Sequence, residues 1–450
     1  MTEGVDTRFT TPAMAAIFAP ERHVRQMLAF EAALARAEAD AGAIPADAAV
    51  AIAACCDVAL FDVAALHHEA ATAGTLAIPL VRELTRRVGG EAGKYVHWGA
   101  TSQDVIDTAL MLQIREGLDL LIGDLLQICA ECADLAERHR RTLMAGRTLL
   151  QQALPITFGL KAARWLALVC RQAHQLSERR ERSVALQFGG AAGTLAALGS
   201  AGILVAERLA GELGLPLPDL PWHSERDRVA AIAAAVGMTA AAMSKIAGDL
   251  VLLAQTEVGE AFEDPAPGKG GSSAMPQKRN PVDSIGALAA ARLALGLVPV
   301  VISAENEHER GAGGWQAESI AIADLFRFTA GAVARVRQAL RGLRIDEARM
   351  RANLDRDGGL LMAESLAMAL AVQLGRPEAQ RVVQAACSRA VASGLTLREA
   401  ALDDEQIRAV LSPADVERAL DPAAYLGSAD ALIDRALEGY RAIRSAMEVP

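Results

Sequence analysis

The sequence has few aromatic residues and a deficit of positive charge. Aromatic side chains make up 4% of the 450 residues, and three of them are tyrosines. The 45 lysines and arginines are outnumbered by 55 aspartates and glutamates, so the formal net charge is -10. A general nucleic-acid-binding or anionic-membrane-binding protein needs a basic surface, which argues against both classes. A local basic pocket for a small anionic substrate is still compatible with this balance.

The six cysteines do not form a metal-binding or disulfide pattern. Cys129 and Cys132 are spaced as CxxC, but no second such pair and no nearby pair of histidines accompanies them. They lie within a continuous helical pattern, where free cysteine behaves as a small hydrophobic residue. We therefore expect structural thiols, no metal site and a reducing, cytoplasmic environment.

No targeting or membrane-spanning segment is recognisable. The first ten residues are polar and charged, without the apolar core of a secretory signal. The most apolar long stretch, 285–303, contains Arg292 and Pro299. A span of about 20 apolar residues should not carry an arginine near its middle, so this stretch is expected to be a helix buried in a bundle.

Hydrophobic residues make up 52% of the chain, and alanine is the main one, which favours helices. A shorter helix is expected over 23–41. Patterns free of helix-breaking residues predict long helices over 104–141, 155–188, 229–262, 282–298 and 317–343. Pro155 is expected at a helix start, and no strand-like alternation persists anywhere.

Helices of 30 residues are about 45 Å long, so they require an elongated bundle. The expected fold class is therefore all-α. It comprises an N-terminal helical domain (1–103), a central long-helix bundle (104–353) and a C-terminal helical domain (354–450).

The segment 264–281 lies between two of the predicted helices and contains four prolines and three glycines in 18 residues. It reads DPAPGKGGSSAMPQKRNP. Loops longer than about 12–15 residues in compact proteins are usually functional or disordered. Because this one combines glycines with serine, lysine, arginine and asparagine, we interpret it as an active-site loop.

Its GSSxMPxKxNP pattern resembles the signature loop of the fumarase/aspartase superfamily. Two further blocks follow the order of that superfamily, TSQDVIDT at 101–108 and GRTLLQQALP at 146–155. The resemblance spans the chain and implies an all-helical homotetramer with active sites that are each built from three subunits. It implies a small-molecule substrate and no cofactor, nucleic acid or membrane.

Enzymes of this superfamily abstract or deliver a proton beside a carboxylate, through an intermediate with two negative charges on that group. Such an intermediate needs preorganised positive charge and hydrogen-bond donors. Lys278 and Asn280 can supply a cation and an amide, and the glycines leave backbone N–H groups able to face an anion. The resemblance makes Ser272 the catalytic serine, with Ser273 and Met275 beside the substrate. Which of the two serines carries the proton stays open.

Thr101, Ser102 and Gln103 directly precede a long predicted helix. Short hydroxyl residues at this position can simply cap the helix. Because the signature loop is also present, we favour the alternative that these residues and the helix N-terminus bind a substrate carboxylate.

The second block departs from most of the superfamily, because Leu149 stands where fumarase-like members have an acid–base histidine. An amine or hydroxide leaving group needs a proton, whereas a carboxylate, with a pKa near ~4, does not. Lactone formation by a carboxylate can therefore dispense with this histidine. Four segments at 73–81, 187–199, 221–228 and 307–318 resemble the bacterial 3-carboxy-cis,cis-muconate cycloisomerase family, which also lacks it.

The resemblance therefore implies conversion of 3-carboxy-cis,cis-muconate to 4-carboxymuconolactone, in the protocatechuate branch of aromatic degradation. The alternative is a lyase of the adenylosuccinate or argininosuccinate type that releases fumarate. Further candidates are polar or aromatic side chains near the blocks, each balanced against an ordinary structural role. They are His97, Arg147, Gln151, Gln152, His308, Arg310 and Trp315.

Overall fold

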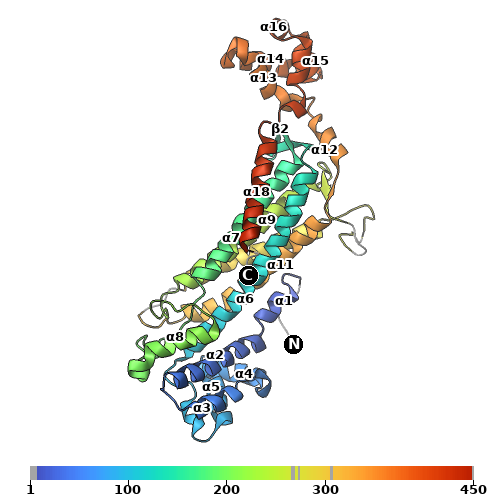
Figure 1. The fold of residues 1–450 in the computed structure, drawn as a ribbon. Helices are drawn as coiled ribbons and strands as arrows, with labels where there is room; N and C mark the ends of the chain where they lie inside the picture. Colours follow the sequence, from blue (N-terminus) through green and yellow to red (C-terminus); the bar gives the residue numbers. More distant parts are fainter. Residues whose placement is uncertain (1–7, 265–268, 272–273, 305–307, 448–450) are drawn as a thin grey trace. The chain divides into compact units, whose positions relative to one another are not determined.

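The computed structural model describes residues 8–264, 269–271, 274–304 and 308–447, and the chain is mostly helical (Figure 1). It divides into two compact units. The first unit comprises residues 1–125, 172–245 and 286–335, and the second comprises 126–171, 246–285 and 336–450. The boundaries between these segments fall within long helices.

The five long helices lie where the sequence predicts them, with changes at their ends. They are α6 (Ser102–Arg138), α7 (Phe158–Arg182), α9 (Asp227–Leu253), α10 (Val282–Ile302) and α11 (Gly314–Arg341). The predicted run to residue 262 is wrong after Leu253, because the chain turns there and Gly259 adopts a φ of 62°. The end of that run forms the short strand β3 (Ala261–Phe262), which pairs with β4 (Arg344–Ile345).

The prediction of an all-α chain without strands is also wrong at residues 143–157. Strands β1 (Leu143–Thr148) and β2 (Gln151–Thr157) form an antiparallel hairpin, with a register irregularity between Ala145 and Arg147. Pro155 therefore lies in β2, opposite Ala145, and not at the start of a helix. The fold is mostly helical, with this hairpin carrying the second sequence block.

In the first unit, α2 (Pro20–Asp40) packs against α3 (Ala46–Ala54) and α8 (Gly202–Leu213). The shorter helices α1 (Pro12–Ile17), α4 (Val63–Ala73) and α5 (Ala77–Val88) complete the N-terminal group, in blue in Figure 1. One small core cluster joins α2 and α3 through Ala35, Ile44, Ala49 and Ile52. Among the described residues of this unit, 3₁₀ turns lie at Val58–Leu60, Ala92–Tyr95 and Ala196–Ala201.

In the second unit, α12 (Glu347–Leu354) packs against β1, and α13 (Ala363–Leu374) packs against α14 (Arg376–Ser393). The chain continues through α15 (Leu397–Asp403), α16 (Glu405–Arg408), α17 (Pro413–Ala419) and α18 (Ala429–Met447), with 3₁₀ turns at Leu360–Met362 and Pro422–Ala424. Buried leucine, valine and alanine side chains form the core of α13 to α17.

Two helices, α9 and α10, are long and apolar enough by composition to cross a membrane. The apolar window of α9 is 61% buried, as expected for a core helix, whereas that of α10 is 28% buried. Leu293, Val300 and Ile302 of α10 are among its exposed apolar side chains. In the single chain, α10 therefore presents an apolar face without a partner among the described residues.

The buried face of α2 contains a carboxyl group, Glu38, that is fully buried. Neither of its oxygens has a hydrogen-bond partner in the described part of the chain. Burial, and then the nearby charge of Glu31, raise the pKa of Glu38 to about 9. At neutral pH this side chain is therefore a neutral acid.

Glu38→Gln is expected to change how stability depends on pH. With a raised pKa in the folded state, the contribution of Glu38 is fully present below its unfolded value of 4.5 and is lost as the pH rises toward 9. The unfolding free energy of the variant relative to the wild type should therefore increase by about 2–4 kcal/mol between pH 5 and pH 8. Urea unfolding at fixed protomer concentration measures it, and the exposed Glu21→Gln on the same helix is the control. Parallel pH curves for wild type and Glu38→Gln would contradict the buried neutral acid.

Candidate active site

In the first unit, one buried carboxylate fixes the turn at the start of α6. Asp104 is fully buried and accepts hydrogen bonds from the backbone N–H groups of Thr101 at 2.9 Å and of Gly189 and Gly190 at 3.0 Å. The ring Nε2 of His223 lies 2.7 Å from its Oδ1. Four partners on two oxygens hold this carboxylate, and with it the turn, in one orientation.

The turn closes tightly on the glycine-rich segment that follows α7. Gly190 has a φ of 70°, and a Cβ placed on it would lie 2.9 Å from the carbonyl oxygen of Gly99. Only glycine combines this conformation with such a close approach. The arrangement places Ser102 at the first position of α6 and leaves Thr101 and Ser102 half-buried. A helix N-terminus with two hydroxyl residues suits a carboxylate, as the sequence predicts.

His97 lies in the same turn and is paired with Glu31 of α2. Its Nδ1 is 2.6 Å from Oε1 of Glu31, and its side chain is 15% exposed. Burial alone lowers the pKa of His97, but the charge and hydrogen bond of Glu31 and the charge of Asp104 outweigh it, so the pKa is raised. The raised pKa favours the positively charged form of His97 beside the N-terminus of α6.

The structure favours a positioning role for Gln103. This side chain is 1% exposed, and its Nε2 donates to Asp107 Oδ2 at 3.0 Å and to the carbonyl oxygen of His223 at 2.8 Å. Its Oε1 accepts from Arg310 Nη1 at 3.1 Å. The amide is therefore used within the chain, and it anchors Arg310, whose Nη2 also donates to the carbonyl oxygen of Ala191 at 2.8 Å.

A buried cluster of charges lies behind this turn. The Arg226 guanidinium donates to Asp107 at 2.8 and 3.1 Å and to Glu318 at 2.5 and 3.1 Å. The side chains of all three are no more than 1% exposed. Burial opposes the charge of Arg226, but the two carboxylates raise its pKa above the usual range. Trp315 joins the cluster, since its Nε1 donates to Asp107 Oδ1 at 2.8 Å.

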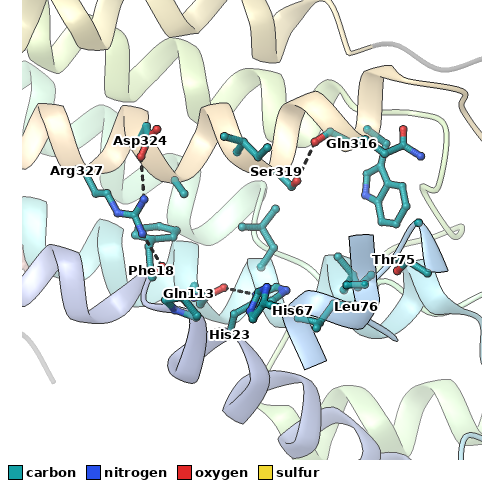
Figure 2. Close-up of a pocket in the computed structure, with 18 residues that line it drawn as sticks. Phe18, His23, His67, Thr75, Leu76, Gln113, Gln316, Ser319, Asp324 and Arg327 are labelled. Carbon is teal, nitrogen blue, oxygen red and sulfur yellow. Dashed lines mark hydrogen bonds and ion pairs between the residues drawn. The ribbon is translucent and has the colours of Figure 1, made fainter. Parts of the chain in front are cut away.

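A cavity of about 470 Å³ also lies in the first unit and is lined in part by Trp315. Figure 2 shows that its polar groups interact with each other, His23 with Gln113 and Arg327 with Asp324. Burial lowers the pKa of His23, so this ring is neutral at neutral pH. Because Arg327 is paired and His23 is neutral, the cavity offers little positive charge to an anionic ligand.

In the second unit, the signature loop is closed at its base. The backbone N–H of Asn280 donates to the carbonyl oxygen of Gly270 at 2.8 Å, and its side-chain Nδ2 donates to the same oxygen at 3.2 Å. Gly270 has a φ of 67°, and a Cβ placed on it would lie 2.5 Å from the carbonyl oxygen of Asn280. Glycine is therefore required where the loop begins.

Within this closed loop, Met275 and Lys278 are exposed, and the Lys278 backbone N–H donates to the Met275 carbonyl oxygen at 3.0 Å. The predicted catalytic residues Ser272 and Ser273 lie outside the described residues. The base of the loop is thus held by two hydrogen bonds from Asn280, and the predicted cation Lys278 is exposed.

The second block forms the β1–β2 hairpin. Arg147 makes a bidentate ion pair with Glu260, at 2.8 and 2.6 Å, and Glu260 is fully buried. Asn353 Nδ2 donates to the same carboxylate at 2.7 Å. The backbone carbonyl oxygen of Asn353 accepts a hydrogen bond from Gln152 Nε2 at 2.9 Å. For Arg147 the structure therefore favours the ion-pairing alternative. Gln152 acts in this chain as a support of the hairpin.

The hairpin tip presents Leu149 and Leu150, whose φ values are 50° and 64°. They are 97% and 72% exposed. Two residues in the left-handed region form a two-residue turn that usually requires asparagine or glycine. Gln151 beside the tip is exposed, as is His308, which also has a positive φ of 51°. Neither has a hydrogen bond to a described side chain.

The sequence did not reveal Glu31, Asp107, Arg226 and Glu318. A sequence shows charged residues but not which of them are buried and paired. For metals, no group of three or more His, Cys, Asp or Glu side chains suited to one is present among the described residues.

Comparison with known proteins shows similarity along most of the chain. Residues 7–294 match the family described as Lyase, and residues 359–436 match the one described as Adenylosuccinate lyase C-terminus. The chain is 50% identical over 419 residues to the 3-carboxy-cis,cis-muconate cycloisomerase of Bradyrhizobium diazoefficiens, covering 92% of this chain and 93% of the relative. It is 46% identical to that of Pseudomonas aeruginosa, covering 97% and 96%. The crystal structure of the 3-carboxy-cis,cis-muconate lactonizing enzyme from Pseudomonas putida matches with a TM-score of 0.92 and 45% identity, over 97% of this chain and 99% of that one.

Proposed function

Because the chain belongs to the lyase family, and within it to the 3-carboxy-cis,cis-muconate cycloisomerases, we propose that it converts 3-carboxy-cis,cis-muconate to 4-carboxymuconolactone. The observation that carries this proposal is similarity over more than nine-tenths of the chain to enzymes of that name, combined with Leu149 in the second block. The chain is an enzyme of aromatic degradation in this reading, and a soluble one. We also propose a cytoplasmic location, because the six cysteines form no disulfide pattern in the sequence, which is typical of a reducing compartment.

The proposed reaction is an intramolecular addition. A carboxylate oxygen of the substrate bonds to the carbon β to another carboxylate, which becomes the doubly charged aci-carboxylate. A proton then adds to the α-carbon, so the trianionic substrate becomes a dianionic lactone. No leaving group needs a proton, which is why Leu149 can replace the histidine of other superfamily members.

The scheme gives roles to the residues of the signature loop and of the α6 N-terminus. Lys278, Asn280 and the loop N–H groups stabilise the aci-carboxylate, and Ser272, or its neighbour Ser273, delivers the proton. Thr101 and Ser102 at the N-terminus of α6, with His97, bind a substrate carboxylate. The pairing of Gln103 with Arg310 supports this turn rather than the substrate.

We also propose that the protein is a homotetramer whose active sites are shared between subunits. The exposed apolar face of α10 supports this, since a large unpartnered apolar surface in a single chain is typical of an interface. The exposed leucines of the hairpin tip are a second candidate contact.

Purified protein is expected to consume 3-carboxy-cis,cis-muconate without added metal. Lactonisation breaks the conjugation of the diene, so ultraviolet absorbance falls and a spectrophotometer follows the reaction directly. The same preparation should not release fumarate from adenylosuccinate or argininosuccinate. Fumarate release from either, without lactonisation, would instead identify the alternative lyase.

A further inference from the structure

One buried carboxylate near the proposed site, Glu31, has no role in the lactonisation scheme. Its side chain is 0% exposed, and its Oε1 lies 2.6 Å from Nδ1 of His97. Its Oε2 has no hydrogen-bond partner among the described residues. Burying a carboxylate is costly unless it is paired, and His97 is the hydrogen-bond partner that the described residues give Glu31.

Among the ionisable groups around the Glu31–His97 pair, Glu31 is the main source of negative charge near His97. Asp104 of α6 also faces His97, but its own Oδ1 is engaged by His223 at 2.7 Å. Glu38, on the same helix as Glu31, is a neutral acid at neutral pH. The thiol of Cys56, after α3, is neutral as well, because burial and then Glu31 raise its pKa to about 12.

His97 is held in one orientation by this pair. Its backbone has a φ of 59°, an uncommon conformation outside glycine, and Nδ1 is fixed by Glu31. A charged imidazole donates from both ring nitrogens, whereas a neutral one donates from one and accepts at the other. When Nδ1 donates to Glu31, the neutral ring has no hydrogen on Nε2. Only the charged form then has an Nε2–H that can donate to a substrate carboxylate. No described residue takes a hydrogen bond from that Nε2.

We propose that Glu31 is a positioning residue that keeps His97 a charged double donor, so that Nε2–H binds one carboxylate of a tricarboxylate substrate. This inference rests on the proposed function, and it adds the residue that sets the charge of the recognition site. The role differs from catalysis, since Glu31 acts through His97 and touches no reacting atom.

The first test is the titration of His97 itself, followed by nuclear magnetic resonance of the imidazole and assigned by the signal lost in His97→Gln. In Glu31→Gln, which keeps the shape of the side chain and removes its charge, the pKa of His97 should fall by about one unit or more. Glu38→Gln is the matched control on the same buried face, and it should leave the titration of His97 in place. An unchanged His97 pKa in Glu31→Gln overturns the proposal.

The second test is recognition of the substrate. In Glu31→Gln, KM for 3-carboxy-cis,cis-muconate at pH 7.5 should rise about tenfold or more while kcat changes by less than about threefold, because one charge-assisted hydrogen bond to the substrate is lost. The rise of KM with pH should begin at a lower pH than in the wild type. A shifted His97 pKa with unchanged KM overturns the recognition role.

Binding of tricarballylate, a tricarboxylate that cannot react, separates this inference from the proposed function. Calorimetry should show that Glu31→Gln weakens this binding about tenfold or more, that Glu38→Gln does not, and that Glu31→Asp retains most of it. If the wild type binds tricarballylate in this pattern but does not lactonise the muconate, the proposed function fails and the role of Glu31 holds. Equal binding by the wild type and Glu31→Gln overturns the inference even if lactonisation is fast. Should Glu31→Gln not fold, Glu31→Asp and the wild-type titration decide, and a wild-type His97 that titrates below 6.5 is the contrary result.

Discussion

Ser272→Ala is expected to lower kcat by about a thousandfold while the protein stays folded. The reason is chemical, because the intermediate is protonated on carbon and alanine has no proton to deliver. Binding of the substrate should change little, since the cationic and amide groups of the loop remain in place. Steady-state kinetics on the muconate, with circular dichroism as the folding check, measure both effects.

Ser273→Ala is the matched control for this prediction. It alters the neighbouring residue of the same GSS segment and is expected to keep kcat within about tenfold of the wild type. A large loss in Ser273→Ala with an active Ser272→Ala would exchange the roles of the two serines. Near-wild-type turnover by both variants would contradict proton delivery by this loop.

Arg226→Met is expected to destabilise the folded protein by about 3–5 kcal/mol, enough to threaten folding. The substitution leaves the carboxylates of Asp107 and Glu318 buried without their shared cation. Burial already raises the pKa of Glu318, although Arg226 opposes the shift, so this carboxylate is poorly solvated even in the wild type. Loss of the arginine should also weaken the hydrogen bonds that Asp107 accepts from Trp315 and Gln103. The turn at the start of α6 would then lose part of its support.

The control is Arg228→Met, two residues further along the chain. Arg228 is half-buried and donates one hydrogen bond, to the carbonyl oxygen of Arg182 at 3.0 Å. Its replacement should cost about 1 kcal/mol or less. Urea unfolding at one protomer concentration compares the variants. Equal destabilisation by the two methionines would contradict the assignment of Arg226 as the centre of the buried cluster.

The long helices are predictable from the sequence because their signal is local. Runs of good helix formers without proline predict α6, α9, α10 and α11. Most of the predicted helix ends lie within one or two turns of the observed ends. The β1–β2 hairpin was missed because its residues show no strand-like alternation and its tip is Leu149-Leu150, not the Asn-Gly or Asp-Gly that signals a two-residue turn. Pro155 was then misinterpreted, since proline suits both a helix start and a strand position that donates no hydrogen bond.

Candidate site residues can be proposed from the sequence where they form a contiguous motif, but not where they depend on tertiary pairing. The signature loop and the TSQD block were recognised from their residues. By contrast, Arg147 and Gln103 resemble ligand-binding residues in the sequence but use their polar groups within the chain. Glu31 could not be found, because only the folded structure brings α2 beside His97.

We propose that this chain closes a lactone by carboxylate addition and then protonates the α-carbon. The most direct measurement is the reaction of 3-carboxy-cis,cis-muconate in D₂O, with the product identified by nuclear magnetic resonance. A serine hydroxyl exchanges with solvent, so we expect 4-carboxymuconolactone with one deuterium on the carbon α to a carboxylate. A product without this deuterium, or folded protein that yields no lactone, would contradict it.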